Sequence, residues 1–466
     1  MSQSYIFATQ SATLSGPRPS AKPVVPLKEF VAVGAQSPGP GVGDQVLIAS
    51  GKADVYEALE PHVYRIAAVD KQSLALELDR AYVTAVPLEK VRQIINRALS
   101  NGANPLTAAE NQAILALLGS PKPTEGQLLD HIKRYIAARG YYFDGETIHN
   151  YHISLKTRPF VILAGLSGTG KSKLPQLYAE AIGHSIQNER YLRVAVRPSW
   201  NDDRYLLGYL NSITDEYVTE PAIDFIIQAE RDRDNLYFFC LDEMNLAHVE
   251  HYFSQFLSAL EEENPADRRI PLYSKATQEK LHKQGKEMVH ERVVIVPPNL
   301  LFTGTVNVDE TTQPLSDKVI DRANTIEFFE VELDKVPQRR PPPDPVHISA
   351  PVWHSYAVQE PDTAFRPRIV ELGKILNEAG LGLGYRVLRE VELYLANSTG
   401  LLKPEVAFDL QVKQRILPRV RGTQVIQPML KKLSVFMKQH SLSRSVARLE
   451  EMENRLKRDG YTSFWR

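Results

Sequence analysis

The first part of the chain carries two kinds of hydrophobic pattern, one after the other. Short apolar-rich stretches separated by turn-forming residues predict strands at residues 44–50, 62–68 and 73–78. Apolar residues then recur every three or four positions, which predicts helices at residues 88–99, 107–118 and 128–136. Residues 1–43 are rich in Ser, Pro and Gly and are expected to be flexible, without a packed core of their own. Residues 44–120 are therefore predicted to form a small β/α domain.

A parallel α/β domain is predicted for residues 121–338, because apolar strand-like runs alternate there with helical patterns. Residues 339–352 begin with RRPPPDP, which can continue neither a helix nor a central strand, and are predicted to be a linker. Residues 353–466 carry an almost entirely helical pattern that is broken at Pro404 and Pro418. The predicted fold class is α/β, with a helical C-terminal region and a smaller N-terminal domain that is rich in strands.

Composition excludes several classes of protein. The 55 Lys and Arg residues balance 56 Asp and Glu residues, so no global positive field attracts nucleic acid or a membrane surface. The single cysteine, Cys240, excludes an internal disulfide framework and a zinc site built from cysteines. The sequence has no apolar run near 18 residues and no signal-peptide pattern at its N-terminus. We therefore expect a cytoplasmic protein that does not associate with membranes.

The strongest chemical signal is a glycine-rich loop, residues 165–172, between a predicted strand and a predicted helix. The loop matches the pattern G-x-x-x-x-G-K-[ST], and this context favours phosphate binding over a glycine-rich turn that binds nothing. Backbone N–H groups of such a loop surround a polyphosphate at a helix N-terminus. Lys171 is expected to reach the β and γ phosphates, and the Ser172 hydroxyl to bind Mg²⁺. The predicted nucleotide-binding residues are Gly165, Leu166, Ser167, Gly168, Thr169, Gly170, Lys171, Ser172 and Lys173.

Two later strands end in residues that suit phosphate chemistry. One ends in Asp242 and Glu243, where one carboxylate can hold Mg²⁺ and the next can act as a general base for the attacking water. Another ends in Asn307, which could contact the γ-phosphate or that water, or could simply form a turn. Arg322 follows a short predicted helix and could stabilise phosphoryl-transfer charge, although a lone arginine is more often a solvated surface residue. Together with the glycine-rich loop, these residues favour a hydrolase over a small-molecule kinase.

In this order the motifs resemble those of an AAA+ NTPase with a helical lid. Within that superfamily the chain is similar to the McrB branch, the NTP-driven motor subunits of modification-dependent restriction systems. The resemblance covers about residues 125–466. It is carried by the stretches FVILAGLSGTGKS, VRPSWNDD, LLGY, LDEMN, GTVN, FDLQVKQRILP and YTSFWR.

The resemblance implies a role for each matching residue. Lys171 and Ser172 would bind phosphate and Mg²⁺, Asp242 would hold the metal, and Glu243 would be the general base. By the same resemblance, three further residues are the first sensor, the arginine finger and the second sensor: Asn307, Arg322 and Arg386. A structural role is the alternative for Arg386. In that case Arg386 pairs with Glu390, four residues later on an exposed helix face.

One part of the family pattern is absent. McrB proteins carry Met-Asn-Thr-Ala-Asp-Arg after the sensor strand, whereas residues 306–311 of this chain read VNVDET. Glu310 therefore stands in the position of the Asp, and Thr311 in the position of the Arg. Because that signature is associated with GTP use, both GTP and ATP remain candidate substrates.

The resemblance also implies partners. It suggests a homo-oligomeric ring of the hexamer type, DNA as a substrate, and a separate McrC-like nuclease subunit, since no nuclease motif is found in the sequence. The N-terminal domain would then choose the target, although Gln45, Tyr56, Tyr64 and Arg65 form no reader motif. The main alternative is a MoxR-like ATPase that remodels protein complexes. A non-hydrolysing, NTP-gated scaffold is a third reading, which the Asp242–Glu243 pair disfavours.

Two further regions could contact DNA. The aromatic residues of segment 196–219 could line a pore or an interface, but packing within an irregular insertion is the favoured reading. Basic residues in the last two helical runs alternate with glutamates, which predicts a solvated helix face rather than a binding patch. These residues are Lys431, Lys432, Lys438, Arg444, Arg448, Arg455, Lys457 and Arg458.

Overall fold

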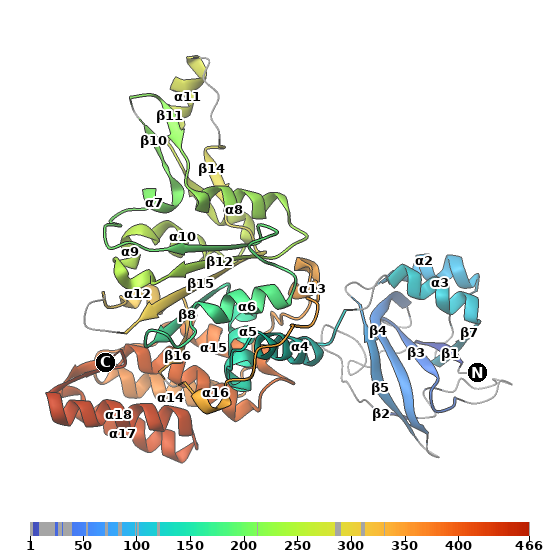
Figure 1. The fold of residues 1–466 in the computed structure, drawn as a ribbon. Helices are drawn as coiled ribbons and strands as arrows, with labels where there is room; N and C mark the ends of the chain where they lie inside the picture. The colour runs from blue at the N-terminus through green and yellow to red at the C-terminus, as the bar shows by residue number, and fades with distance from the viewer. Residues whose placement is uncertain are drawn as a thin grey trace. The chain divides into compact units, whose positions relative to one another are not determined.

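The protein is described by a computed structural model in which the chain forms two compact units, Met1–Leu128 and Leu129–Arg466 (Figure 1). Within the described residues, no helix combines the length and the apolar character needed to cross a bilayer. The described residues are 3–8, 24–26, 30, 40–52, 55–69, 73–82, 86–97, 99, 102–118, 122–211, 213–284, 290–308, 313–329 and 331–465.

The described residues of the first unit form a seven-stranded sheet in the order β2-β5-β4-β3-β1-β7, with β6 paired to β4. In this sheet β1 and β3 run parallel, and the other described pairs run antiparallel. The strands are β1 (Ser4–Ala8), β2 (Val24–Pro26), β3 (Gln45–Lys52), β4 (Val55–Val69), β5 (Ser73–Ala81), β6 (Val86–Pro87) and β7 (Gly102–Leu106). The helices are α2 (Leu88–Ile95) and α3 (Ala108–Leu118).

Both faces of this sheet are covered. Ile6 and Leu47 belong to a core that includes α2 and α3, whereas the adjacent Phe7 and Ile48 belong to a core on the other face. This alternation follows from the two-residue repeat of a strand. The two strands β1 and β2 come from residues 1–43, which the sequence predicts to be flexible and without a packed core. The difference arises because Tyr5, Ile6 and Phe7 favour a strand, but their apolar run is too short to stand out in a Ser- and Pro-rich segment.

Of the four residues considered for target recognition, three have a packing role or form a polar contact within the first unit. Tyr64 is fully buried in the core, and Gln45 accepts a hydrogen bond from Asn111. Arg65 forms an ion pair with Asp79, 2.9 Å away. The side chain of Tyr56 lies outside the described residues.

The second unit is built on a five-stranded parallel sheet in the order β16-β8-β15-β12-β9. Strand β8 is buried along its whole length and entirely apolar except for its final glycine, as expected for a parallel sheet covered on both faces. The chain is therefore of mixed α/β type. The strands are β8 (Phe160–Gly165), β9 (Tyr191–Ala195), β12 (Tyr237–Asp242), β15 (Leu300–Asn307) and β16 (Asn324–Phe328).

Helices cover both faces of this sheet (Figure 1). Consecutive residues of β12 show the two faces, because Phe238 contacts Tyr178 of α6 whereas Phe239 contacts Phe225 of α8. The helices around the sheet are α4 (Glu125–Ala138), α5 (Gly145–Thr157), α6 (Lys173–Ala181), α7 (Arg204–Leu207), α8 (Pro221–Arg231), α9 (Val249–Tyr252), α10 (Ser254–Ala259) and α12 (Asp317–Ile320). Short 3-10 segments are η1 (Met244–Leu246), η2 (Pro265–Asp267) and η3 (Leu333–Lys335).

Two antiparallel insertions project together from the sheet (Figure 1). They are the hairpin β10 (Tyr209–Asn211) with β11 (Glu216–Val218), and the pair β13 (Arg269–Pro271) with β14 (Val293–Ile295), which flanks α11 (Lys275–Lys283). Tyr217 of the hairpin contacts Tyr273 of the second insertion. Trp200 is buried and stacks on Tyr205. Packing therefore accounts for much of the aromatic content of segment 196–219.

The C-terminal region is helical and has its own apolar core, to which Ile153 of α5 also belongs. Pro404 stands at the start of a helix rather than inside one, and Pro418 lies in a 3-10 turn, so each proline is accommodated without breaking a helix. The elements are α13 (Ala350–His354), α14 (Arg366–Asn377), α15 (Tyr385–Ser398), α16 (Pro404–Gln411), η4 (Val412–Ile416), η5 (Leu417–Arg419), β17 (Arg421–Thr423), η6 (Gln424–Ile426), α17 (Gln427–Gln439), α18 (Ser443–Asp459) and β18 (Tyr461–Ser463).

The predicted linker, residues 339–352, is extended before α13 and is bonded to the α/β part of the unit. The Arg340 amide donates to the Ala138 carbonyl, and the Val346 amide donates to the Ala181 carbonyl. These contacts hold the proline-rich segment against the ends of α4 and α6.

Candidate functional site

The candidate site lies where three parallel strands end side by side. In the sheet, β15 lies between β8 and β12, and its last residue, Asn307, is in register with Gly165. The glycine-rich loop follows β8, and Asp242 ends β12. Because parallel strands end at the same edge, the structure brings the loop, Asn307 and Asp242 together there.

The glycine-rich loop has the backbone conformation of a turn into a helix. Gly168 and Gly170 have φ values of +80° and +91°, in the left-handed region that favours glycine. The Lys171 ammonium lies across the loop and donates to the carbonyl oxygens of Gly165, at 3.1 Å, and Leu166, at 2.5 Å. Helix α6 begins at Lys173, directly after the loop. The loop therefore sits at the positive end of a helix dipole, a common place for a bound anion.

Gly165 is required by the sheet as well as by the loop. A Cβ atom on Gly165 would lie 1.9 Å from the carbonyl oxygen of Phe328, the last residue of β16. That same oxygen accepts a 3.2 Å hydrogen bond from the Leu166 amide. The first glycine of the motif thus lets β16 approach the start of the loop, whereas a Cβ on Gly168 would meet open space.

The hydroxyl of Ser172 and the carboxylate of Asp242 are directly bonded. Ser172 Oγ donates to Asp242 Oδ1 at 2.5 Å, and Thr305 Oγ1 donates to the same oxygen at 2.7 Å. Thr305 Oγ1 also accepts from the Glu243 amide at 2.8 Å, so it fixes the end of β12. A hydroxyl and a carboxylate fit Mg²⁺, which is usually held by one or two protein oxygens together with phosphates. The described residues contain no cluster of three or more His, Cys, Asp or Glu side chains suited to a metal.

Glu243 is held by its backbone and by its side chain. Its φ of 53° and ψ of 46° are left-handed, which is uncommon outside glycine and is found at functional sites. Asn307 Nδ2 donates to Glu243 Oε1 at 2.9 Å. Asn307 is fixed in turn by the buried Asn245, which donates to its carbonyl at 2.8 Å and accepts from its amide at 3.2 Å. The carboxylate is thus poised in a defined orientation at the edge of the sheet.

Two of these residues, Thr305 and Asn245, were not identified as site residues from the sequence. Thr305 lies two positions before Asn307 on β15, so the two side chains share one face of the strand. Asn245 is part of the LDEMN stretch. The two-residue spacing between Thr305 and Asn307 could have identified Thr305 from the sequence. For Asn245, the corresponding indication was a polar residue close to Asp242 and Glu243.

A cavity of about 800 Å³ adjoins the glycine-rich loop. Its walls include Thr169 of the loop, the aromatic residues Phe143 and Phe329, and Arg444 and Arg448 of α18. The cavity is therefore enclosed by the α/β part of the unit and by its helical C-terminal region.

Arg448 corrects the prediction that the basic residues of the last helices form one solvated face. Its side chain is only 4% exposed, pairs with Glu327 at 2.9 Å, and lies over the rings of Phe329 and Phe464. Lys413 contacts the other oxygen of Glu327 at 2.6 Å. The pattern of alternating charges could not show this, because it does not reveal that one side of α18 packs against β16. Other members of the set are exposed as predicted: Lys431, Lys432, Lys438, Lys457 and Arg458.

Arg322 and Arg386 lie away from the glycine-rich loop. Arg322 comes just before β16, and β16 pairs in parallel with β8, so this arginine lies at the amino edge of the sheet. Strand β8 has six residues and is about 20 Å long at about 3.3 Å per residue, and this length separates that edge from the loop. Arg386 reaches the same edge, because it shares Glu261 with Arg322. Neither arginine therefore lies beside the glycine-rich loop of its own chain.

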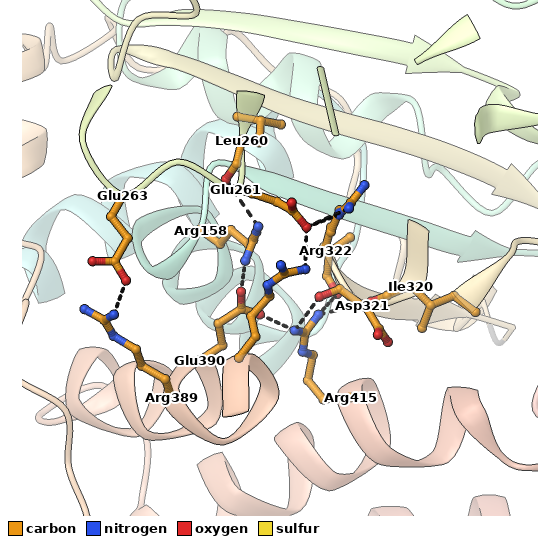
Figure 2. A network of polar contacts seen from close by, with 12 residues as sticks. Arg158, Leu260, Glu261, Glu263, Ile320, Asp321, Arg322, Arg389, Glu390 and Arg415 are labelled. Carbon is orange, nitrogen blue, oxygen red and sulfur yellow. Dashed lines mark hydrogen bonds and ion pairs between the residues drawn. The ribbon is translucent and has the colours of Figure 1, made fainter. Parts of the chain in front are cut away.

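The amino edge carries a network of arginines and carboxylates (Figure 2). Glu390 pairs with Arg158 and Arg415. The predicted pair between Glu390 and Arg386 is therefore not formed. Arg415 also donates to the carbonyls of Ile320 and Asp321, at 3.1 Å and 3.0 Å. Burial, followed by the positive charges of Arg415 and Arg386, lowers the pKa of Arg158 to about 9. The largest of these causes is the burial of the guanidinium group.

Glu310 and Thr311, which stand in place of the family's Asp and Arg, lie outside the described residues.

Comparisons with known proteins give limited similarity. Residues 353–461 match the model of a domain of unknown function, DUF8727. A search of curated proteins finds no significant match. Among solved structures, the chain is similar to that of a "putative ATPase" from Cytophaga hutchinsonii, with 14% sequence identity and a TM-score of 0.37. That similarity covers 61% of this chain and 79% of the other.

Proposed function

We propose that this chain is a nucleoside-triphosphate hydrolase of the AAA+ class that works as a ring-shaped homo-oligomer. One arrangement carries the proposal: Ser172 is bonded to Asp242, and Asn307 to Glu243, beside the glycine-rich loop. The first pair supplies metal-binding oxygens, and the second supplies an oriented general base. This combination suits hydrolysis of a phosphate chain held by the loop.

Each residue has a defined task in the proposed reaction. The loop amides and the start of α6 hold the phosphates, and Lys171 offsets their negative charge. Mg²⁺, held by Ser172 and Asp242, would stabilise charge on the β and γ phosphates. Glu243 accepts a proton from a water molecule whose oxygen bonds to the γ-phosphorus, while the bond from that phosphorus to the β-phosphate oxygen breaks. Asn307 keeps the Glu243 carboxylate turned toward this water.

The cavity beside the loop would hold the base and ribose of the nucleotide. Its volume of about 800 Å³ is within the range of small-molecule sites, and its aromatic walls suit stacking against a purine ring. Both GTP and ATP remain candidate substrates, since a purine of either kind meets these requirements.

The arginines at the amino edge favour an oligomer. Because Arg322 and Arg386 are separated from the loop of their own chain by the length of the sheet, they would act on a nucleotide bound by an adjacent copy. An arginine supplied by a neighbouring molecule is an established way to stabilise phosphoryl-transfer charge. The active unit is then the interface between two copies, and a ring supplies one such interface per subunit.

The proposed biological role is that of a motor in a McrBC-like restriction or antiviral complex. In this role hydrolysis drives movement along DNA or remodelling of DNA for a separate McrC-like nuclease subunit. The support is the similarity of the sequence motifs over about residues 125–466. A MoxR-like ATPase that remodels protein complexes shares the same hydrolytic site, and DNA dependence separates the two.

The first experiment measures hydrolysis of GTP and ATP by the full-length protein, with and without duplex DNA. We expect Lys171→Ala to lose nucleotide binding, and Glu243→Gln to bind nucleotide but turn it over at least about 100-fold more slowly. Glu279→Gln, at an exposed position on α11, is the matched control and should hydrolyse like the wild type.

Each outcome has a distinct meaning. Turnover of GTP that DNA stimulates supports the McrB-like motor, whereas ATP turnover that is indifferent to DNA supports the protein-remodelling role. Wild-type protein that hydrolyses neither nucleotide contradicts the proposal, as does a Glu243→Gln variant with wild-type turnover.

A further inference from the structure

Glu261 binds Arg322 and Arg386 through a single oxygen atom. Arg322 approaches Glu261 Oε1 with Nε at 2.7 Å and with Nη2 at 2.6 Å, and Arg386 approaches the same oxygen with Nη1 at 2.6 Å. The three residues come from separate segments: Glu261 follows α10, Arg322 follows α12, and Arg386 lies in the first turn of α15. One carboxylate therefore joins the α/β part of the unit to the helical region at this point.

Without the carboxylate these arginines would repel each other. Their guanidinium groups approach within about 5 Å, because each contacts the same oxygen, and like charges at that range are unfavourable even with solvent screening. Glu261 supplies the intervening negative charge. It therefore determines both the distance and the relative orientation of the two arginines.

The position of Glu261 is itself fixed by its neighbours (Figure 2). Arg158 donates to the carbonyl of Leu260, the preceding residue, at 3.3 Å. Arg158 is in turn paired with Glu390 of α15, one turn beyond Arg386. The carboxylate that holds the two arginines is thus anchored to buried parts of both regions.

The arrangement leaves the arginines able to bind a second anion. A guanidinium group carries five N–H donors, and Arg322 directs only two of its nitrogens at Glu261, whereas Arg386 directs one. Two guanidinium groups and one carboxylate also retain a net positive charge. Arg386 is 44% exposed along its side chain, so it is accessible from solvent.

We infer that Glu261 is a positioning residue, which holds Arg322 and Arg386 as one pair for the phosphate of a nucleotide bound by an adjacent copy of the chain. This inference rests on the proposed function. Glu261 does not touch the nucleotide itself and acts only through the two arginines.

Glu263 is a matched control because it occupies the same segment two residues later. It pairs with Arg389, the other arginine on this side of α15, and both of those side chains are more than half exposed. Neutralising Glu263 therefore changes the local charge as much as neutralising Glu261 does, but leaves Arg322 and Arg386 in place.

The test compares Glu261→Gln with Glu263→Gln in the full-length protein. Because the nucleotide contacts of the loop are intact, we expect Glu261→Gln to lower kcat about 10-fold or more and to leave KM within about twofold. Glu263→Gln should keep wild-type kcat. Glu261→Asp keeps the charge and should recover part of the lost rate. Thermal unfolding and ring assembly are measured for all three variants, so that a folding defect is recognised.

A mixing experiment tests whether Glu261 acts in the subunit that donates the arginines rather than in the subunit that binds the nucleotide. Lys171→Ala subunits cannot bind nucleotide and Arg322→Ala subunits cannot donate, so hydrolysis by a mixture of the two requires an interface between them. Adding Glu261→Gln to the Lys171→Ala subunits should lower this recovered activity about 10-fold or more. Adding it to the Arg322→Ala subunits should preserve most of it, because their arginine pair is already broken.

The outcomes separate this inference from the proposed function. Wild-type protein without hydrolysis overturns both. An active wild type with unchanged or faster turnover in Glu261→Gln overturns the positioning role alone, as does an equal loss in Glu263→Gln. If Glu261→Gln fails to fold, Glu261→Asp replaces it in the mixtures: equal losses with this substitution on either subunit contradict the inference.

Discussion

Asn307 donates a 2.9 Å hydrogen bond from its side-chain amide to the carboxylate of Glu243, across 64 residues of sequence. Asn307 ends β15 and Glu243 directly follows the neighbouring strand β12, where it has a left-handed backbone that a glutamate rarely adopts. The contact therefore holds the Glu243 carboxylate in a defined orientation. In the proposed function, Asn307 would therefore position the carboxylate that acts as general base.

Asn307→Ala should lower kcat about 10- to 100-fold, because a general base that is free to rotate is aligned with the water less often. Nucleotide affinity should change little, since the glycine-rich loop is untouched. Steady-state hydrolysis and nucleotide titration measure the two effects. Asn264→Ala, which removes an exposed cap of η2, serves as the control. An Asn307→Ala variant with wild-type kcat would show that Glu243 does not depend on this contact.

Thr305→Val should weaken the response to Mg²⁺. The substitution keeps the shape of the side chain but removes the hydroxyl that holds Asp242 Oδ1 at 2.7 Å. Loss of such a supporting contact typically costs about 10- to 100-fold in metal affinity or activity. The measurement is the Mg²⁺ concentration that gives half-maximal hydrolysis.

Thr303→Val is the matched control for that prediction, because it lies two residues earlier on the same face of β15 and bonds instead to Tyr151, at 2.8 Å. It should cost about 1 kcal/mol in the free energy of unfolding while leaving the Mg²⁺ requirement unchanged. Equal shifts of the Mg²⁺ requirement in the two variants would contradict the specific role of Thr305.

Gly165→Ala should destabilise the fold, independently of any nucleotide. The added methyl group would lie 1.9 Å from the Phe328 carbonyl oxygen, so β8 and β16 would have to move apart. We expect a loss of about 3 kcal/mol in the free energy of unfolding, measured by urea denaturation. Gly373→Ala, inside α14 and with only ordinary contacts, should have unchanged or slightly higher stability. A Gly165→Ala variant as stable as the wild type would mean that the two strands can separate at little cost.

His184 should make the protein less stable in mild acid. It is fully buried, its Nε2 bonds to the Ile348 carbonyl at 2.8 Å, and burial lowers its pKa to about 4. The unfolded chain binds the proton first, near pH 6.5, so this part of the stability is present above pH 6.5 and is lost as the pH falls toward 4. Between pH 7.5 and pH 5 the loss from His184 should be about 2 kcal/mol.

Urea unfolding of the wild type and of His184→Gln at both pH values tests this. The variant should lose about 2 kcal/mol less of its stability between the two values, because it lacks the titrating group. Buried histidines that do not contact His184 contribute equally to both proteins and cancel in the comparison. An identical pH dependence in the two proteins would rule out His184 as the source.

The residues at the carboxyl edge of the sheet could be located from the sequence because each follows a recognisable strand. The glycine-rich loop, Asp242 and Asn307 all come directly after apolar runs, and parallel strands bring such positions together. The residues that hold these side chains in place by hydrogen bonds could not be predicted in the same way. A threonine such as Thr305 is common in strands for its shape alone, so its hydroxyl is not a distinctive signal.

The amino edge was not predictable from local patterns at all. Glu261 and Arg322 are 61 residues apart, and Arg386 lies farther along the chain. Glu261 and Arg322 are ordinary charged residues that each follow a short helix, and Arg386 lies in the first turn of α15. Only the folded sheet, which sets the direction of β16 relative to β8, determines that these side chains meet. The buried strand β1 escaped prediction for a related reason, since its pairing partners β3 and β7 lie far away in the sequence.

The strand order has a consequence for the synthesis of the chain. Ser172 meets Asp242 only across 70 residues, and Asp242 meets Thr305 only across a further 63. A ribosome would release the glycine-rich loop well before β15, which must insert between the strands on either side of it, and β16 follows later still. Contacts of such long range form late in folding. A nascent chain therefore exposes the glycine-rich segment before Asp242 and Thr305 are available to complete these contacts.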